Sequence, residues 1–238
     1  KVLDAMCACL NTHPGNPHAR DHQYGWEALA AVEDARAEVA ALVGCSPLEI
    51  IFTSGATEAN NLALTGLALG CRDQGTARRR IITSPIEHRS VLEPAALLGQ
   101  MGFELSYVKP RSDGRTEAED LAALLGPDVL LVSIAEANSE LGTVNDVAAL
   151  AELSAQAGAF FHTDMAQSAG LTGTTLGGSR IALATLTAEK CGGPKGVGAL
   201  FVNRELKVPL HALIFGGGQE KGLRGGTVAT HQAVGMGT

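Results

Sequence analysis

The sequence lacks several features that would place it in a specialised class of protein. None of its apolar runs reaches the roughly 18 residues that a membrane span needs. Residues 1–10 contain no long apolar stretch and no cleavage site, so no signal peptide is expected. The net charge is −7, and the basic run Arg78 to Arg80 is only three residues long. This balance argues against a general nucleic-acid surface, and the basic run is interpreted as a solvated loop.

The cysteines also lack the spacing of a metal or redox site. They form no CxxC pair and no metal-finger pattern. An odd number of cysteines without an export signal predicts reduced thiols and a cytoplasmic protein. Cys45 and Cys71 are interpreted as ordinary residues beside helices. The five positions are Cys7, Cys9, Cys45, Cys71 and Cys191.

What the sequence does contain is a regular alternation of helix-like and strand-like segments. This alternation predicts an α/β domain with a mainly parallel sheet and helices on both faces. Such sheets bind ligands at the carboxyl ends of their strands. Helices are predicted at residues 25–43, 58–69, 90–101, 117–125 and 147–157. Strands are predicted at 49–53, 80–83, 104–108, 129–134, 159–162, 181–186 and 197–202.

A small-residue loop follows the first predicted strand and opens a helix. It reads Thr53-Ser-Gly-Ala-Thr-Glu-Ala-Asn-Asn61. Small residues let the backbone approach a ligand, and the free N–H groups of a helix start bind anions. Thr57 adds a hydroxyl. The loop is therefore either a phosphate site or a simple capped helix start, and it is neither a Walker loop nor a GxGxxG fingerprint.

Polar residues follow three further strands, and each has a structural alternative. His88, in EHRS, can stack on a flat ring or move protons. Asn138, in EANSELGT, is alternatively a turn residue. Asp164, in HTDMAQS, can hold a pyridinium nitrogen protonated or cap a turn.

A lysine follows a fifth strand, in the stretch TAEKCGGPKGVGALFV. Lys190 is either a Schiff-base amine for a carbonyl cofactor or a solvated lysine of a surface turn. Taken together, the strand ends carry an anion site, a ring stacker, polar partners and an amine. This set matches what pyridoxal 5′-phosphate (PLP) requires of a protein, and the coincidence is more specific than any single motif.

The order of these motifs resembles the class V (fold type I) PLP enzymes, and among them the cysteine desulfurase group, with selenocysteine lyase nearby. The resemblance covers almost the whole chain, including IIFTSGATEANNLAL, EHRSV, ANSELGTV, HTDMAQSAG and FGGGQEKGLRGGTVATHQAVGMG. It implies a fold type I large domain with a seven-stranded type of sheet over residues 1–238. The small C-terminal domain and the catalytic cysteine loop are expected beyond residue 238.

The resemblance also implies a role for each site residue. Lys190 would carry the cofactor, and His88 would stack on its ring and assist proton transfer. Asp164 would pair with the ring nitrogen, Gln167 with the phenolic oxygen, and Asn138 would lie by the ring and the substrate carboxylate. The phosphate contacts would come from Ala56, Thr57 and Thr187, and from Thr227 of the other subunit of a homodimer.

The implied reaction releases sulfur from L-cysteine. The substrate amine displaces Lys190, the freed lysine takes the Cα proton, and an enzyme thiolate attacks the substrate sulfur. The products are an enzyme persulfide and L-alanine, and the persulfide passes to an acceptor such as an iron–sulfur scaffold protein. Sulfur supply to other thio-cofactors or to nucleic acid is a related outcome.

The sequence departs from the family pattern at several points. Glu189 stands where the family has a histidine that helps bind the phosphate, and a nearby carboxylate would repel that dianion. Gly225 replaces the serine of the dimer loop. Neither the sulfur-accepting cysteine nor the carboxylate-binding arginine can be assigned, and Cys191 is considered for the former without being adopted.

Three interpretations therefore stand. The leading one is a PLP-dependent cysteine desulfurase. The second is selenocysteine lyase acting on L-selenocysteine, or another class V aminotransferase-like enzyme. The third is a degenerate, non-catalytic dimerising scaffold. The presence of Glu189 and the lack of an assignable cysteine and arginine favour this interpretation.

Overall fold

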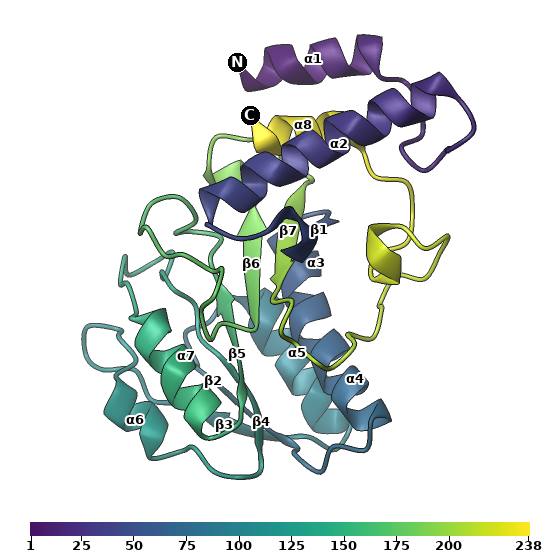
Figure 1. The fold of residues 1–238 in the computed structure, drawn as a ribbon. Helices are drawn as coiled ribbons and strands as arrows, with labels where there is room; N and C mark the ends of the chain where they lie inside the picture. Colours follow the sequence, from purple (N-terminus) through teal and green to yellow (C-terminus); the bar gives the residue numbers. More distant parts are fainter.

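The computed structural model describes residues 1–238 and is built around one seven-stranded sheet (Figure 1). The strand order is β1-β7-β6-β5-β4-β2-β3. Only β7 runs antiparallel to its neighbours, so the predicted mainly parallel α/β fold is confirmed. The strands are β1 (Ile50–Thr53), β2 (Arg80–Thr83), β3 (Glu104–Tyr107), β4 (Val129–Ser133), β5 (Phe160–Asp164), β6 (Leu183–Thr187) and β7 (Gly198–Val202).

Every predicted helix is present, with ends shifted by a few residues. The predicted helix 58–69 is part of a longer helical run, in which the five-residue π turn Leu62–Gly66 joins α3 to α4. Helix α2 (Gln23–Leu42) precedes β1. The α-helices between the strands are α3 (Ala56–Asn61), α4 (Leu67–Asp73), α5 (Arg89–Gln100), α6 (Ala118–Ala122) and α7 (Val147–Gln156).

Two terminal helices were not predicted, α1 (Val2–Thr12) and α8 (Thr230–Gly237). Glycines give α8 little intrinsic helical tendency, and the helix forms where it packs between α1 and α2 (Figure 1). A Cβ atom on Gly235 would come within 2.8 Å of Met6, and one on Gly237 within 2.8 Å of Ala35. The glycines thus allow a close approach of helices that the local pattern does not reveal.

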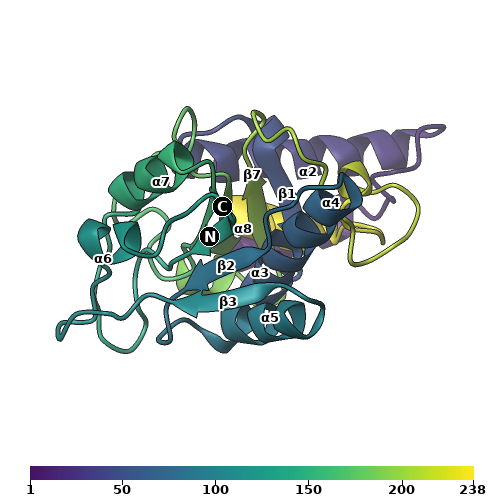
Figure 2. The same cartoon turned by 90° about the horizontal axis from the view of Figure 1, so that it is seen from below.

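Apart from the edge strand β3 and one end residue each of β2, β5 and β7, the strands are buried on both faces, because their side chains alternate between two apolar layers. Ile50 and Phe52 join the layer formed with α2, α6, α7 and α8, whereas Ile51 joins the layer formed with α3, α4 and α5. Figure 2 shows α6 and α7 on one side of the sheet and α5 on the other. This two-sided cover leaves the carboxyl ends of the parallel strands as the open edge.

The basic run Arg78 to Arg80 is not the solvated loop that was expected. All three residues are partly buried at the edge of the sheet. Arg78 donates to the carbonyls of Val129 and Ala157 at 2.8 and 3.1 Å, and Arg80 pairs with Asp128 at 2.7 Å. Long side chains that satisfy backbone carbonyls explain why the cations are retained here. Separately, no helix of this chain has the length and apolar character that a bilayer crossing requires.

Candidate active site

A cavity of about 970 Å³ opens where the parallel strands end. It brings together residues that follow β1, β2, β4, β5 and β6. All but one of the predicted site residues line it: Ala56, Thr57, His88, Asn138, Asp164, Gln167, Thr187 and Lys190. The exception is Thr227, which lines a smaller neighbouring cavity of about 140 Å³.

The turn between β1 and α3 is shaped by glycine and held by a carboxylate. Gly55 has φ +148°, a backbone conformation that favours glycine. A Cβ on Gly198 of β7 would lie 2.7 Å from the Cα of Gly55, so the two backbones are closely packed. Glu58 accepts from the backbone N–H of Ser54 at 2.9 Å and from Arg224 Nε at 3.0 Å. These contacts fix the start of the helical run, and residues 54–58 line the cavity.

Asp164 is the last residue of β5 and is only 8% exposed. Its Oδ2 accepts from Asn60 Nδ2 at 2.7 Å, and its Oδ1 accepts from the Ala166 N–H at 2.8 Å. Burial raises the pKa of Asp164, while the hydrogen bonds from Asn60 and Ala166 and the proximity of His88 oppose that rise. The carboxylate therefore lies in a desolvated position that favours a cationic partner.

His88 caps the start of α5 and also lines the cavity. Its Nδ1 accepts the backbone N–H of Ser90 at 3.1 Å and lies 2.7 Å from the Ser90 hydroxyl. That hydroxyl also accepts from Asn60 Nδ2 at 2.8 Å. His88 and Asp164 are thus connected through two buried polar side chains.

The loops after β2 and β4 are joined by Glu87 and Asn138. Both carboxylate oxygens of Glu87 accept from the Ala135 N–H, at 3.0 and 3.1 Å. Burial is the main reason that the pKa of Glu87 rises to about 8, and the nearby Asp164 adds to it. Asn138 donates to the Ile86 carbonyl at 3.0 Å, while its oxygen accepts from two backbone N–H groups of its own turn. Asn138 therefore shapes the turn as well as lining the cavity.

The turn after β6 is more open. Lys190 ends a short 3₁₀ turn (Ala188–Lys190), and 47% of its side chain is exposed. Its Nζ lies 3.9 Å from Glu189 Oε1, and both residues line the cavity. Lys195 is exposed and does not line it. Of the two lysines in the glycine-rich stretch, only Lys190 lines this cavity.

Cys191 follows Lys190 but does not line the cavity. Its thiol donates to the Ala169 carbonyl at 3.6 Å, and partial burial raises its pKa. A raised pKa lowers the fraction of reactive thiolate. Both observations argue against Cys191 as the sulfur-accepting nucleophile.

The loop that carries Thr227 is attached to α2 by a buried ion pair and to β1 by a hydrogen bond. Arg36 of α2 makes a two-pronged contact with Glu220, with both N–O distances 2.8 Å. Glu220 also accepts from the Phe52 N–H at 2.7 Å. Glu220 and the adjacent Lys221 have φ values of +46° and +59°, so this loop is held in a conformation that non-glycine residues rarely adopt.

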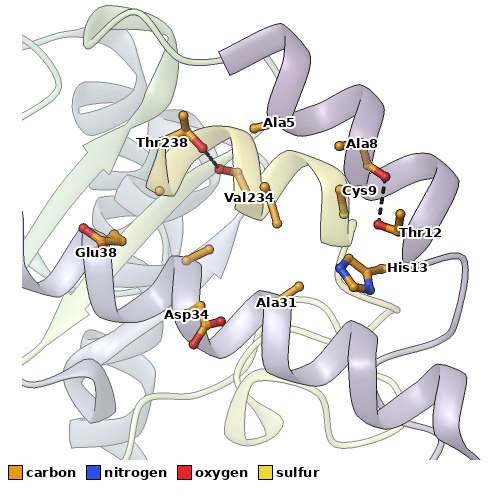
Figure 3. Close-up of a pocket in the computed structure, with 12 residues that line it drawn as sticks. Ala5, Ala8, Cys9, Thr12, His13, Ala31, Asp34, Glu38, Val234 and Thr238 are labelled. Carbon is orange, nitrogen blue, oxygen red and sulfur yellow. Dashed lines mark hydrogen bonds between the residues drawn. The ribbon is translucent and has the colours of Figure 1, made fainter. Parts of the chain in front are cut away.

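A separate cavity of about 310 Å³ lies between α1, α2 and α8 (Figure 3). Its lining includes Asp34, Glu38 and several alanines but no lysine or arginine. It contains none of the predicted site residues and does not suit an anionic ligand. The cleft at the strand ends is therefore the candidate active site.

Several site residues were not identified from the sequence. Asn60 and Ser90 link His88 to Asp164, and Glu87 links two loops. His162 is fully buried between Ser133 and Thr185, and burial lowers its pKa to about 3, so it remains neutral. Asn60 and Glu87 belong to motifs that were singled out from the sequence, but their partners lie 30 to 104 residues away along the chain.

Comparison with known proteins gives this geometry a context. The chain is 46% identical to cysteine desulfurase IscS of Azotobacter vinelandii and of Pseudomonas syringae pv. tomato, over 239 aligned residues in each case. Each alignment covers all of this chain but only 58% of the relative.

Solved structures agree. The structure titled "SspA in complex with cysteine" matches with a TM-score of 0.93 and 38% identity, covering 99% of this chain and 67% of that one. DndA from Streptomyces lividans matches with a TM-score of 0.87 and 40% identity, covering 99% and 66%. The fold type I architecture inferred from the motifs is thereby confirmed.

The resemblance to class V enzymes and their desulfurase group is confirmed as well, and these are PLP-dependent proteins. The profile of the family described as "Aminotransferase class-V" matches residues 1–238. A match over the full length, together with the shared fold and the relatives' identity, establishes that the chain belongs to the class-V aminotransferase family.

Proposed function

We propose that this chain is the PLP-binding large domain of a cysteine desulfurase. The family's small domain and cysteine loop would then belong to a part of the protein beyond residue 238. The observation that carries the proposal is the meeting of Lys190, Asp164, His88 and Gln167 in one cleft at the strand ends. The curated relatives are named cysteine desulfurases, and one similar structure is titled as a complex with cysteine. L-cysteine is therefore the proposed substrate and L-alanine the proposed product.

The residues of the cleft fit PLP. The buried carboxylate of Asp164 lies in the cavity wall and suits a pyridinium nitrogen. The start of the helical run at Ala56 and Thr57, with buried Thr187 nearby, supplies donors for a phosphate. Gln167 supplies an amide for the phenolic oxygen. When bound, the conjugated ring accepts electron density from the substrate Cα.

Asp164 and His88 have complementary proposed roles. Desolvation of Asp164 strengthens its attraction to a cation, so it favours the protonated ring nitrogen. His88 presents its imidazole to the cavity with Nδ1 occupied by Ser90. This leaves the face of the imidazole for stacking and Nε2 for proton transfer at the ring. Asn138, with its amide oriented by Ile86, lies where it would contact the ring or the substrate carboxylate.

Lys190 is the proposed cofactor-bearing residue and the base at Cα. Its half-exposed amine lies in the cavity and has few internal contacts, so it is free to move between the cofactor and the substrate. The carboxylate of Glu189, 3.9 Å away, holds the amine near the cleft. Because Glu189 is paired with Lys190, its repulsion of a phosphate is reduced.

The sulfur-transfer step requires a thiolate that attacks the substrate sulfur and retains it as a persulfide. We assign no cysteine of this chain to that step, because Cys191 lies outside the cavity. An acceptor protein for the persulfide, such as an iron–sulfur scaffold, completes the proposed reaction. The five cysteines are free, in keeping with the proposed cytoplasmic location.

A homodimer is part of the proposal. Thr227 does not line the main cavity and lies beside Ser54 and Gly196 in the smaller one. Because Thr227 lies outside the main cavity on a fixed loop, it suits a contact with the phosphate bound by a second copy of the chain. Gly225 in the same loop leaves the backbone without the hydroxyl that the family has there.

The other interpretations have less support. The similar proteins favour a desulfurase over selenocysteine lyase. A degenerate scaffold would have no reason to keep Lys190, Asp164 and His88 facing the same cavity. The retained set therefore favours an enzyme.

The deciding experiment follows the Cα proton of L-alanine, the proposed product, by NMR in D₂O. With PLP bound, the chain is expected to exchange this proton, because formation of L-alanine and its reverse share the proton transfer at Cα. The Lys190→Ala variant is the matched control and should not exchange it. The measurement is made on the protein with its small domain present, and bound PLP without any exchange there would contradict the enzyme proposal and leave the scaffold interpretation.

A further inference from the structure

A buried chain of polar side chains connects the two best-defined groups of the cleft. Asn60 Nδ2 donates to Asp164 Oδ2 at 2.7 Å and to Ser90 Oγ at 2.8 Å. Ser90 Oγ in turn lies 2.7 Å from His88 Nδ1. Asn60 is completely buried and Ser90 is 7% exposed. In such surroundings each hydrogen bond is stronger than it would be in water.

The direction of every bond in this chain is determined by its members. A carboxylate accepts only, so the Asn60 nitrogen must face Asp164. The same nitrogen donates to Ser90 Oγ, and the Ser90 hydroxyl hydrogen is then free to point at His88. The backbone N–H of Ser90 also donates to Nδ1 at 3.1 Å. Two donors facing Nδ1 require that this nitrogen accepts.

An accepting Nδ1 places the proton of a neutral imidazole on Nε2. Nε2 of His88 has no hydrogen-bond partner within the chain, and His88 lines the cavity. The hydrogen-bonding capacity of this nitrogen is thus left for a ligand. A histidine that populates both neutral tautomers would have a proton on Nε2, and so a hydrogen-bond donor, only part of the time.

We infer that Asn60 and Ser90 are positioning residues that hold His88 in the Nε2–H tautomer and link it to Asp164. The inference deepens the proposed function and rests on it, since it concerns how the cleft presents His88 to the cofactor ring. Both residues act through His88 and Asp164 and contact no cofactor themselves. Neither role was apparent from the sequence, because Asn60 and Asp164 are 104 residues apart.

The test is the tautomer of His88, measured on the ¹⁵N-labelled 238-residue chain by long-range ¹H–¹⁵N correlation at a pH where His88 is neutral. The cofactor-free chain is expected to show one tautomer, with the proton on Nε2. Ser90→Ala removes the shorter of the two contacts at Nδ1, the 2.7 Å hydroxyl, and leaves only the 3.1 Å backbone N–H. Asn60→Ala releases the hydroxyl to turn away. In both variants the Nδ1 and Nε2 resonances should move part of the way toward each other, which marks a weakened preference for the Nε2–H tautomer.

Two further variants separate positioning from folding. Ser90→Thr keeps the hydroxyl and should retain the single-tautomer spectrum. Asn61→Ala removes an exposed amide from the same helix, one that donates only to the Thr57 carbonyl, and should change nothing. If Asn60→Ala does not fold, Ser90→Ala and Ser90→Thr decide the question alone.

The result that overturns the inference is an unchanged His88 spectrum in Ser90→Ala. Because this readout needs neither PLP nor substrate, it is independent of the desulfurase proposal. A mixed tautomer in Ser90→Ala combined with no Cα exchange in the unmodified protein with its small domain present would support the positioning role and contradict the proposed function. With exchange present, Ser90→Ala should also alter its pH profile, since the donor at Nε2 is only partly populated.

Discussion

The two sides of the cleft differ in how their functional groups are held. On one side, Asp164, Asn60, Ser90 and His88 form a buried network in which Asp164 is 8% exposed and Asn60 is not exposed at all. On the other side, Lys190 has a 47% exposed side chain and only a 3.9 Å contact with Glu189. We call these the fixed side and the open side.

The difference corresponds to the proposed tasks. Groups that stabilise a charge on a ring work best when they are already oriented and desolvated, because no reorganisation is needed at the moment of reaction. An amine that must bond to a cofactor, release it and then take a proton needs freedom to move. The fixed side is therefore expected to tolerate substitution poorly, and the open side is expected to respond according to which lysine is changed.

The largest effect is expected at Lys190. Lys190→Ala should abolish the covalent attachment of PLP, whereas Lys195→Ala should retain it, because only Lys190 lines the cavity. Borohydride reduction followed by peptide mapping measures the attachment directly. Pyridoxyl label on Lys195 in the unmodified chain would contradict the assignment and the description of the open side.

The next largest effect is expected at Asp164. Asp164→Asn removes the negative charge and one of the two acceptor oxygens while keeping the shape of the side chain. Losing one partner of a buried charge pair costs about 3 kcal/mol or more, which corresponds to a fall of about 100-fold or more in the rate of Cα exchange.

PLP should still bind to this variant, as absorbance spectra will show. Asp146→Asn is a suitable control, since Asp146 is an exposed cap of α7 outside the cavity. Equal exchange rates in Asp164→Asn and the unmodified chain would remove Asp164 from its proposed role.

This contrast also explains which parts of the molecule could be predicted from the sequence. The strands were predicted closely because they are short apolar runs buried on both faces, as in Val129–Ser133. The strand ends then placed Asp164 and His88 correctly at one edge. Helix α8 was missed because its glycines matter only when α1 and α2 are in place.

The fixed side could not be predicted in the same way. The contact between Asn60 and Asp164 spans 104 residues, and that between Asn60 and Ser90 spans 30. Nothing in the local pattern around Asn60 distinguishes it from Asn61, which is only half-buried on the same helix. Only the three-dimensional arrangement shows which of the two asparagines faces the site.

A third prediction concerns the pH dependence of stability. The pKa of Glu87 rises from 4.5 to about 8 on folding because the carboxyl is buried. Between these values the folded state binds more protons than the unfolded state, so the contribution of Glu87 to stability falls as the pH rises. Glu87→Gln should remove this decline.

The measurement is the free energy of unfolding by urea at several pH values from 5 to 9, compared between the unmodified chain and each variant. Glu140→Gln serves as the control, because Glu140 is exposed at the same cleft. Parallel pH curves for Glu87→Gln and the unmodified chain would show that Glu87 titrates normally.

The smallest effect is expected at Glu189, on the open side. At about 4 Å and an effective dielectric of about 20, one like-charge contact with a phosphate would cost about 4 kcal/mol. The side chain of Glu189 is 38% exposed and lies 3.9 Å from Lys190, so solvent and the neighbouring cation screen much of this repulsion. Glu189→His should therefore tighten PLP binding by no more than about tenfold, which corresponds to about 1.4 kcal/mol.

Fluorescence titration of the cofactor-free chain gives the dissociation constant, and Glu140→Gln should leave it unchanged. A gain far above tenfold would mean that Glu189 faces the phosphate without screening, and no gain at all would mean that the carboxylate never approaches it.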